Sequence, residues 1–259
     1  MSRSLERIVN RQVLRWNQQR AKKEGGGERV HRFEQQPMIC ISREFGGLGG
    51  EIGKVVARRL GFDFYGQELV HEIAQRAHVR DQLVESLDER LQDNVQAWVS
   101  QLIDGSCFAP SDYLRNLSKV VLTLGRHGRG VLIGRGAHLI LNPKSTLRVR
   151  TFGPLEQRIE YIARRDGLKE ADARKKVLRI DAERVAFYRE HFGVNVGDPH
   201  LFDLLINVGT LTVDAAADLV IQAFHARFEP ASAHPKSYIR SLVPEESPLP
   251  VSSRRRDVG

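Results

Sequence analysis

The chain has 259 residues, a formal net charge of +8 and 41% hydrophobic residues. This length suits one domain with a full core and appended segments. No stretch approaches the roughly 20 apolar residues of a transmembrane helix, which excludes a membrane span. The basic N-terminus lacks a signal peptide's apolar segment, and Cys40 and Cys107 belong to no metal-binding spacing. We therefore expect a cytoplasmic protein in a reducing compartment, with a charge that favours anionic ligands.

Residues 1–36 form a basic extension. Apolar residues at 5–14 recur at helical spacing, and the glycines at 25–27 would end such a helix. We expect a solvated extension or one that packs between subunits, through which a homo-oligomer could form. A membrane-surface helix and a nucleic-acid arm are alternatives. We do not favour nucleic acid as a partner, because Trp16 is not followed by the aromatic residues that stack on bases.

The most informative stretch is 37–61. Residues 38–41 are apolar, as in a buried strand, and glycines follow at 46, 47, 49 and 50. Apolar residues then recur at helical spacing until Gly61. A strand, a glycine loop and a helix start predict phosphate binding, because the loop N–H groups can turn inward at the positive end of a helix. A glycine-rich turn without a ligand is the alternative.

The glycine loop departs from the Walker A pattern Gly-x-x-x-x-Gly-Lys-Ser/Thr. The junction of loop and helix reads Gly49-Gly50-Glu51, and the nearest lysine is Lys54, about one turn into the helix. Arg43, at the strand end before the loop, or Lys54 would have to replace the missing lysine.

The remaining elements alternate between strands and helices. Further strands are predicted at 62–65, 130–134, 147–152 and 202–207, and helices at 68–79, 81–103, 112–124, 154–165, 169–192 and 213–228. Asp112 and Thr212 are the expected N-caps of two of these helices. This order predicts a parallel sheet with right-handed crossovers. Residues 229–259 are rich in proline, so we expect a disordered tail after a domain at 37–228.

Arginines gather after two of the predicted strands. Arg135 follows the strand at 130–134, at the sheet edge where ligands bind in parallel α/β folds. Arg158, Arg164 and Arg165 follow the next strand, and Asp181 and Arg184 lie one helical turn apart. Guanidinium groups match phosphate oxygens in pairs, so these residues could surround a polyphosphate. Salt-bridged, solvated helices are the alternative.

Over roughly residues 37–226 the chain resembles the cytidylate kinase-like branch of the P-loop nucleoside monophosphate kinases. The resemblance is carried by residues 41–53, 60–65 and 131–136, by Asp181-x-x-Arg184, and by residues 202–207 and 211–214. It implies a three-layer α/β fold of the P-loop NTPase type. The five-stranded parallel sheet would have the order 2-3-1-4-5, with helical insertions that bind the nucleoside monophosphate and form a lid over 153–190.

The resemblance also implies an activity, the transfer of phosphate from ATP to a nucleoside monophosphate, with CMP or dCMP as the expected acceptor and Mg²⁺ as the cofactor. Two departures concern the site. Gly49 and Glu51 replace the lysine and the magnesium-binding hydroxyl, and Gly136 replaces the aspartate of Gly-Arg-Asp. A non-catalytic, nucleotide-binding or regulatory module on the same fold is therefore the alternative.

The resemblance and the residue pattern together name the site residues. The expected catalytic residues are Arg43, Arg135, Arg158, Arg164 and Arg165. The resemblance implies that Arg135 holds the acceptor phosphate and that Arg158, Arg164 and Arg165 hold the transferring phosphates. The expected nucleotide- and phosphate-binding residues are Phe45, Gly46, Gly47, Leu48, Gly49, Gly50, Glu51, Ile52, Asp181 and Arg184. Glu51 is also the expected magnesium ligand, because carboxylates bind this ion well.

Overall fold

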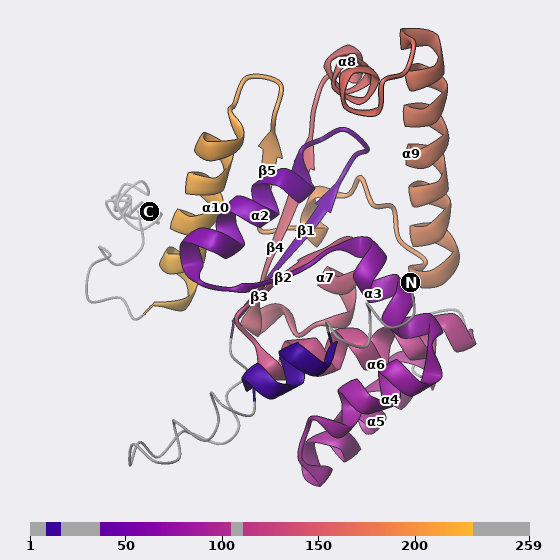
Figure 1. Ribbon diagram of the computed structural model, residues 1–259, viewed down its shortest axis with the longest axis vertical. Coiled ribbons are helices and arrows are strands. Elements are labelled where there is room, and N and C mark those ends of the chain that lie inside the picture. Colours follow the sequence, from indigo (N-terminus) through magenta and orange to yellow (C-terminus); the bar gives the residue numbers. More distant parts are fainter. Residues whose placement is uncertain (1–8, 17–36, 105–110, 230–259) are drawn as a thin grey trace, which may run out of the picture. The chain divides into compact units, whose positions relative to one another are not determined.

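The computed structural model describes residues 9–16, 37–104 and 111–229. The predicted tail after residue 229, and the N-terminal extension other than 9–16, lie outside the described residues. The strands are β1 (Met38–Arg43), β2 (Asp63–Tyr65), β3 (Gly130–Ile133), β4 (Thr146–Phe152) and β5 (Leu204–Asn207) (Figure 1). The helices are α2 (Gly49–Leu60), α3 (Gln67–Gln75), α4 (Ala77–Glu85), α5 (Glu89–Asp104), α6 (Asp112–His127), α7 (Ala137–Ile140), α8 (Leu155–Asp166), α9 (Glu170–Phe192) and α10 (Val213–Phe228).

The strands form one parallel sheet in the order β2-β3-β1-β4-β5, which confirms the expected topology. In the central pairs, Ile41 lies opposite Ile133 on one side and Val149 on the other. Because all strands run in the same direction, their carboxyl ends share one edge of the sheet. Arg43 lies at that edge, and the residues that follow β3 and β4 leave from it.

Alternation along β1 gives each face of the sheet its own hydrophobic core. Ile39 and Ile41 belong to the cluster that α2 and α10 cover, whereas Met38 and Cys40 belong to the cluster that α3 and α6 cover. Successive side chains of a strand point to opposite faces, so an apolar strand must be buried on both. The chain thereby forms the three-layer fold, and helices fix the position of the sheet edge from both sides.

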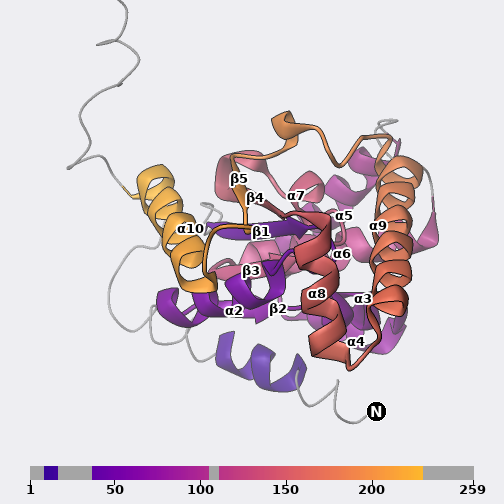
Figure 2. The same cartoon turned by 90° about the horizontal axis from the view of Figure 1, so that it is seen from above.

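Helices α8 and α9, called here the lid helices, pack against each other beyond the carboxyl end of the sheet (Figures 1 and 2). Their contact is a small core of Ile159, Ile162, Ala173 and Val177. Phe45, from the loop after β1, is half-buried against this core. The lid helices therefore rest directly on the glycine loop.

Two predicted boundaries in the helical lobe are wrong. The predicted helices at 68–79 and 81–103 are three helices, because Arg76 is extended between α3 and α4 and Asp88 starts α5 by accepting the Leu91 N–H at 3.0 Å. Ser111, and not Asp112, caps α6, since its hydroxyl accepts the Leu114 N–H. The predicted cap of the last helix is confirmed, with Thr212 accepting the Ala215 N–H at 3.1 Å.

Residues 9–16 form a helix that packs on the same chain. Trp16 is buried and stacks on His127 with ring centroids 3.5 Å apart, and Arg15 pairs with Asp63 at 2.7 Å. In the part of the chain that the structure describes, no helix combines the length and the apolar character that a membrane crossing requires.

Candidate nucleotide site

The glycine loop, residues 44–50, joins the end of β1 to the start of α2. Gly46 has a φ of 81°, and Leu48, the residue before the helix, adopts a left-handed conformation with a φ of 55°. Non-glycine residues rarely adopt positive φ, and such strain concentrates at functional sites. Two backbone hydrogen bonds fix the loop. The Glu44 N–H donates to Thr151 O of β4 at 3.1 Å, and the Gly47 N–H donates to Glu44 O within the loop at 3.0 Å.

The start of α2 leaves several backbone donors open. Among the described residues, the amides of Leu48, Gly49, Gly50 and Glu51 donate no hydrogen bond. The Ile52 amide, also predicted to bind phosphate, donates to Leu48 O at 2.9 Å within the first turn. Open amides at the positive end of a helix form an anion-binding surface. The glycine loop therefore has the donors that a phosphate requires.

The amide of Phe45 is occupied by the protein itself. It donates to Asp181 Oδ1 at 2.7 Å, which links the glycine loop to α9. Asp181 Oδ2 in turn lies 2.5 Å from Arg158 Nη1, and Arg158 also donates to Phe45 O and to Gly153 O, each at 3.0 Å. With its side chain 9% exposed, Arg158 lies under the loop and holds the lid helices to it.

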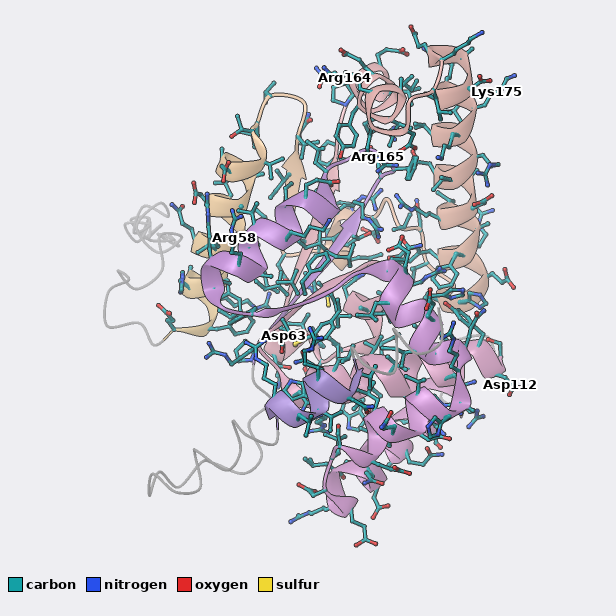
Figure 3. All side chains as sticks on the ribbon, viewed as in Figure 1. Arg58, Asp63, Asp112, Arg164, Arg165 and Lys175 are labelled. Atoms are coloured by element: carbon teal, nitrogen blue, oxygen red, sulfur yellow. The ribbon has the colours of Figure 1, made fainter. Side chains whose placement is uncertain are left out.

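The other two arginines expected on the transferring phosphates differ in placement (Figure 3). Arg164 points to solvent, with its side chain 73% exposed and 3.6 Å from Glu160. Arg165 lies over the Phe45 ring, 5.3 Å from its centroid, and is held by a two-bond contact to Asp166 that raises the pKa of Arg165. Of these two residues, Arg165 is the one that the structure brings to the glycine loop.

A cavity of about 310 Å³, called here the arginine cavity, adjoins the loop at the carboxyl edge of β1, β3 and β4. Side chains of α3 and α9 close it. Four arginines line it, namely Arg43, Arg135, Arg150 and Arg184. The structure thus brings Arg43, Arg135 and Arg184 together, as the sequence predicted, and adds Arg150, which the sequence reasoning did not single out.

Three of the four guanidinium groups have no carboxylate partner among the described residues. Arg43 donates to Gln67 Oε1 at 2.8 Å, and Arg150 lies 3.4 Å from Ser42 Oγ. The Nε of Arg135 is buried without an acceptor. Burial lowers the pKa of Arg43 to about 10, which leaves it charged at neutral pH. Since a buried charge is costly unless it is paired, this cavity is prepared for an anion.

Two glycines place Arg135 in this cavity. Arg135 has a φ of 55°, and Gly134 and Gly136 on either side of it also have positive φ. A Cβ at position 134 would overlap the Arg43 guanidinium, and a Cβ at position 136 would overlap the Phe192 ring. The turn after β3 therefore requires glycine at positions 134 and 136. The Phe192 ring occupies the space that a side chain at position 136 would need.

Glu51 faces the lid, and Lys54 does not reach the loop. Glu51 Oε1 accepts a hydrogen bond from the Tyr161 hydroxyl at 2.8 Å. Lys54 is exposed and lies over the Phe64 ring of β2, 5.9 Å from its centroid. No group of three or more His, Cys, Asp or Glu side chains in the described ranges could hold a metal ion by itself.

Sequence reasoning missed Arg150 and Tyr161. Arg150 lies directly opposite Ser42 in the sheet register, so its place at the strand edge could have been found from the β4 pattern once the pairing was known. Tyr161 lies on α8 three residues after Arg158, and nothing in the local pattern points from it to Glu51.

The chain is similar in sequence to proteins of known family. A sequence model of the cytidylate kinase-like family matches residues 38–210. The chain is 26% identical over 194 residues to a cytidylate kinase of Methanopyrus kandleri, covering 74% of this chain and 96% of that protein. It is 31% identical over 100 residues to a uronate isomerase of Corynebacterium glutamicum, covering 38% of this chain but only 19% of that protein.

A solved structure supports the fold alone. The crystal structure of an uncharacterized protein from Eubacterium ventriosum has a TM-score of 0.53 and 21% sequence identity to this chain. The match covers 74% of this chain and all of the other. The family match spans all five strands of the sheet and both lid helices, so the chain belongs to the cytidylate kinase-like family.

Proposed function

We propose that the protein is a nucleotide kinase that transfers a phosphoryl group from ATP to a nucleoside monophosphate, with CMP or dCMP as the first acceptors to test. The observation that carries this proposal is that two anion sites meet at the end of β1. Glu44, the first residue of the glycine loop that carries the open amides, also lines the cavity with three guanidinium groups that lack carboxylate partners. Phosphoryl transfer requires little more than positioned phosphates and neutralised charge.

On the donor side, the amides of residues 48–51 would bind the phosphates of ATP. Arg165 is the cation that the lid provides above the loop, since its guanidinium lies over Phe45. Arg158 would act at a distance, by fixing the position of Phe45 and Asp181. The lid helices would exclude water from the transferred group, because they close the loop from the outside.

On the acceptor side, the arginine cavity would hold the phosphate of the nucleoside monophosphate. Arg43 and Arg135 supply fixed, unpaired positive charge, and Arg150 adds a third group opposite Ser42. Guanidinium forks match phosphate oxygens, so the cavity would orient the attacking oxygen toward the loop. Arg184 donates to Arg43 O at 3.0 Å and so joins this cavity to α9.

The residues present also fit magnesium, the usual companion of ATP. This ion binds through one or two carboxylates together with substrate phosphates and waters, and needs no cage of protein ligands. Glu51 is a carboxylate in the first turn of α2 with one oxygen free of any partner in the described residues. When bound, the ion would neutralise charge on the transferring phosphates, and Glu51 would hold it.

One observation favours the alternative of a non-catalytic nucleotide-binding module. A Cβ on Gly49 would lie 2.9 Å from Arg43 Cβ and from Thr151 Oγ1, so the packing leaves no room for the usual lysine at this position. A site without that lysine could bind ATP and transfer nothing. ATP binding with no ADP formation would support this alternative.

The test is ADP formation by the purified full chain with ATP, Mg²⁺ and each of the common ribo- and deoxyribonucleoside monophosphates in turn. We expect acceptor-dependent ADP formation, and loss of most of it in Arg135→Met. A matched control is Arg227→Met, because Arg227 pairs with Asp203 away from the lining of the cavity. The absence of turnover with every acceptor would contradict the kinase proposal, and full activity of Arg135→Met would contradict the acceptor site.

A further inference from the structure

We propose that Tyr161 is a positioning residue for Glu51, and that through Glu51 it makes the donor site prefer Mg²⁺ to Ca²⁺. The inference rests on the proposed function, since it concerns the ion that accompanies ATP. Its basis is one contact between the lid and the glycine loop region, which neither the sequence pattern nor the comparisons assign.

The contact joins two elements that are distant in sequence. Tyr161 lies on α8, and Glu51 lies in the first turn of α2. The Tyr161 hydroxyl donates to Glu51 Oε1 at 2.8 Å, and both side chains are partly buried. Glu51 Oε2 has no partner in the described ranges, and it belongs to the same helical turn as the open amides of Gly49 and Gly50. Tyr161 therefore leaves Glu51 with a single free oxygen beside the expected phosphate site.

A carboxylate beside a phosphate site repels the ligand unless a cation lies between them. At an effective dielectric constant of 20, two like charges 4 Å apart repel by about 4 kcal/mol. Glu51 is thus unfavourable for binding of free ATP and favourable for ATP that carries a divalent ion. A glutamate at position 51 would therefore make the site select the metal complex of ATP over free ATP.

The single free oxygen also selects among ions. Mg²⁺ demands near-ideal octahedral geometry, whereas Ca²⁺ accepts flexible geometry and carboxylates that bind through both oxygens. The Tyr161 hydroxyl uses one lone pair of Oε1 and fixes the carboxylate, which favours an ion bound through Oε2 alone. Loss of the hydroxyl would free both oxygens and let the carboxylate rotate, which weakens an octahedral site and favours Ca²⁺.

Tyr161 also has a neighbour that orients its ring. The Arg165 guanidinium lies 5.8 Å from the ring centroid of Tyr161 and packs its face. The side chain is thereby held in place by a residue of its own helix.

The experiment is a calorimetric titration of the full chain with a non-hydrolysable ATP analogue in Mg²⁺, in Ca²⁺ and in EDTA. The variants are Tyr161→Phe and Glu51→Gln. The control is Tyr65→Phe, which also removes a tyrosine hydroxyl bonded to a carboxylate, that of Asp63 at 3.4 Å, but on strand β2, outside the glycine loop and the lid helices. Thermal unfolding of each variant confirms that it folds.

We expect Tyr161→Phe to lower the affinity in Mg²⁺ about tenfold, the usual effect of losing one hydrogen bond to a charged group. The affinity of Tyr161→Phe for the analogue in Ca²⁺ should be equal to or higher than that of the wild type. Glu51→Gln should bind the analogue equally well with and without metal. Tyr65→Phe should behave as the wild type. Equal affinities of Tyr161→Phe and wild type in both ions would overturn the inference while the proposed function stands. A wild type that binds the analogue equally in Mg²⁺ and EDTA would overturn both the inference and the magnesium part of the proposed function.

Discussion

Arg158 and Asp181 form an ion pair beneath the glycine loop, with Arg158 Nη1 and Asp181 Oδ2 2.5 Å apart. The pair joins α8 to α9, and both partners also bond to the backbone of Phe45. Arg158 is buried and donates to the backbone oxygens of Phe45 and Gly153, so its role in the site is to fix the position of the loop. The lid helices and the loop therefore behave as one unit in this conformation.

Loss of Asp181 should destabilise the fold. Asp181→Ala removes one of the two carboxylates that pair with the 9% exposed Arg158 side chain, the other being Glu44 at 3.2 Å, and it leaves the Phe45 amide without its acceptor. We expect the free energy of unfolding to fall by about 2 kcal/mol or more. Denaturant unfolding measures this effect. Glu190→Ala, an exposed change on the same helix, should stay within about 0.5 kcal/mol of the wild type, and equal curves for both variants would contradict the prediction.

Two neighbouring glycines should respond in opposite ways to alanine. At Gly49 a Cβ meets Arg43 and Thr151 at 2.9 Å, whereas at Gly50 nothing lies within 4 Å. We expect Gly49→Ala to lower the free energy of unfolding by about 1–3 kcal/mol. Gly50→Ala should raise it by up to about 1 kcal/mol, because alanine favours the helix. The same reasoning predicts that Gly49→Lys destabilises the protein without raising activity, and a more active Gly49→Lys would show that the loop can repack.

The two adjacent lid arginines should differ in their effect on ATP. Arg165 lies over the Phe45 ring, and Arg164 points to solvent. Arg165→Ala should weaken ATP binding about tenfold, as expected for one charge-assisted contact. Arg164→Ala should leave the affinity unchanged, so each variant is the control of the other. Calorimetry in Mg²⁺ measures both, and equal losses would mean that the lid closes in a different orientation.

His138 should make the fold sensitive to acid. The His138 side chain is 3% exposed and lies against the rings of Tyr188 and Phe202. Its pKa is lowered to about 3, mainly by burial and further by the charges of Arg148 and Arg150. In the unfolded chain the His138 imidazole takes up a proton near pH 6.5, whereas in the folded chain it stays neutral until about pH 3. Below about pH 6.5 the free energy of unfolding should therefore decline by up to about 1.4 kcal/mol per pH unit because of this residue.

The variant His138→Leu tests this assignment. Unfolding free energies measured from pH 7 to pH 5 should decline less in the variant than in the wild type, because leucine binds no proton in either state. Parallel declines would contradict the assignment of the acid sensitivity to His138.

The fold was largely predictable because its signals are local. The apolar strand Met38–Arg43, the glycines after it and the helix that ends before Gly61 follow from spacing and backbone preference alone. The helical lobe was harder, since the break at Arg76 depends on tertiary packing and leaves no glycine or proline in the sequence. Asp88 was a readable helix start that the continuous leucine pattern obscured.

The site was predictable in outline and not in detail. Arg43 and Arg135 could be placed because Arg43 ends one strand and Arg135 follows another, and strand ends meet at one edge of a parallel sheet. The different surroundings of Arg158, Arg164 and Arg165 could not, because three arginines within eight positions of one helix look alike in sequence. Their neighbours, Asp181 on α9 and Phe45 in the loop, are brought to them only by the folded chain.

The most direct measurement is the binding of a bisubstrate analogue, in which two nucleosides are joined by a polyphosphate chain. If the glycine loop and the arginine cavity hold the two phosphates of one reaction, calorimetry should show one analogue per chain, bound more tightly than ATP or CMP alone. The analogue should displace both of these nucleotides, and Arg135→Met should remove the gain in affinity. An analogue that binds no better than ATP, or that leaves CMP bound, would show that the two sites do not serve one transfer reaction.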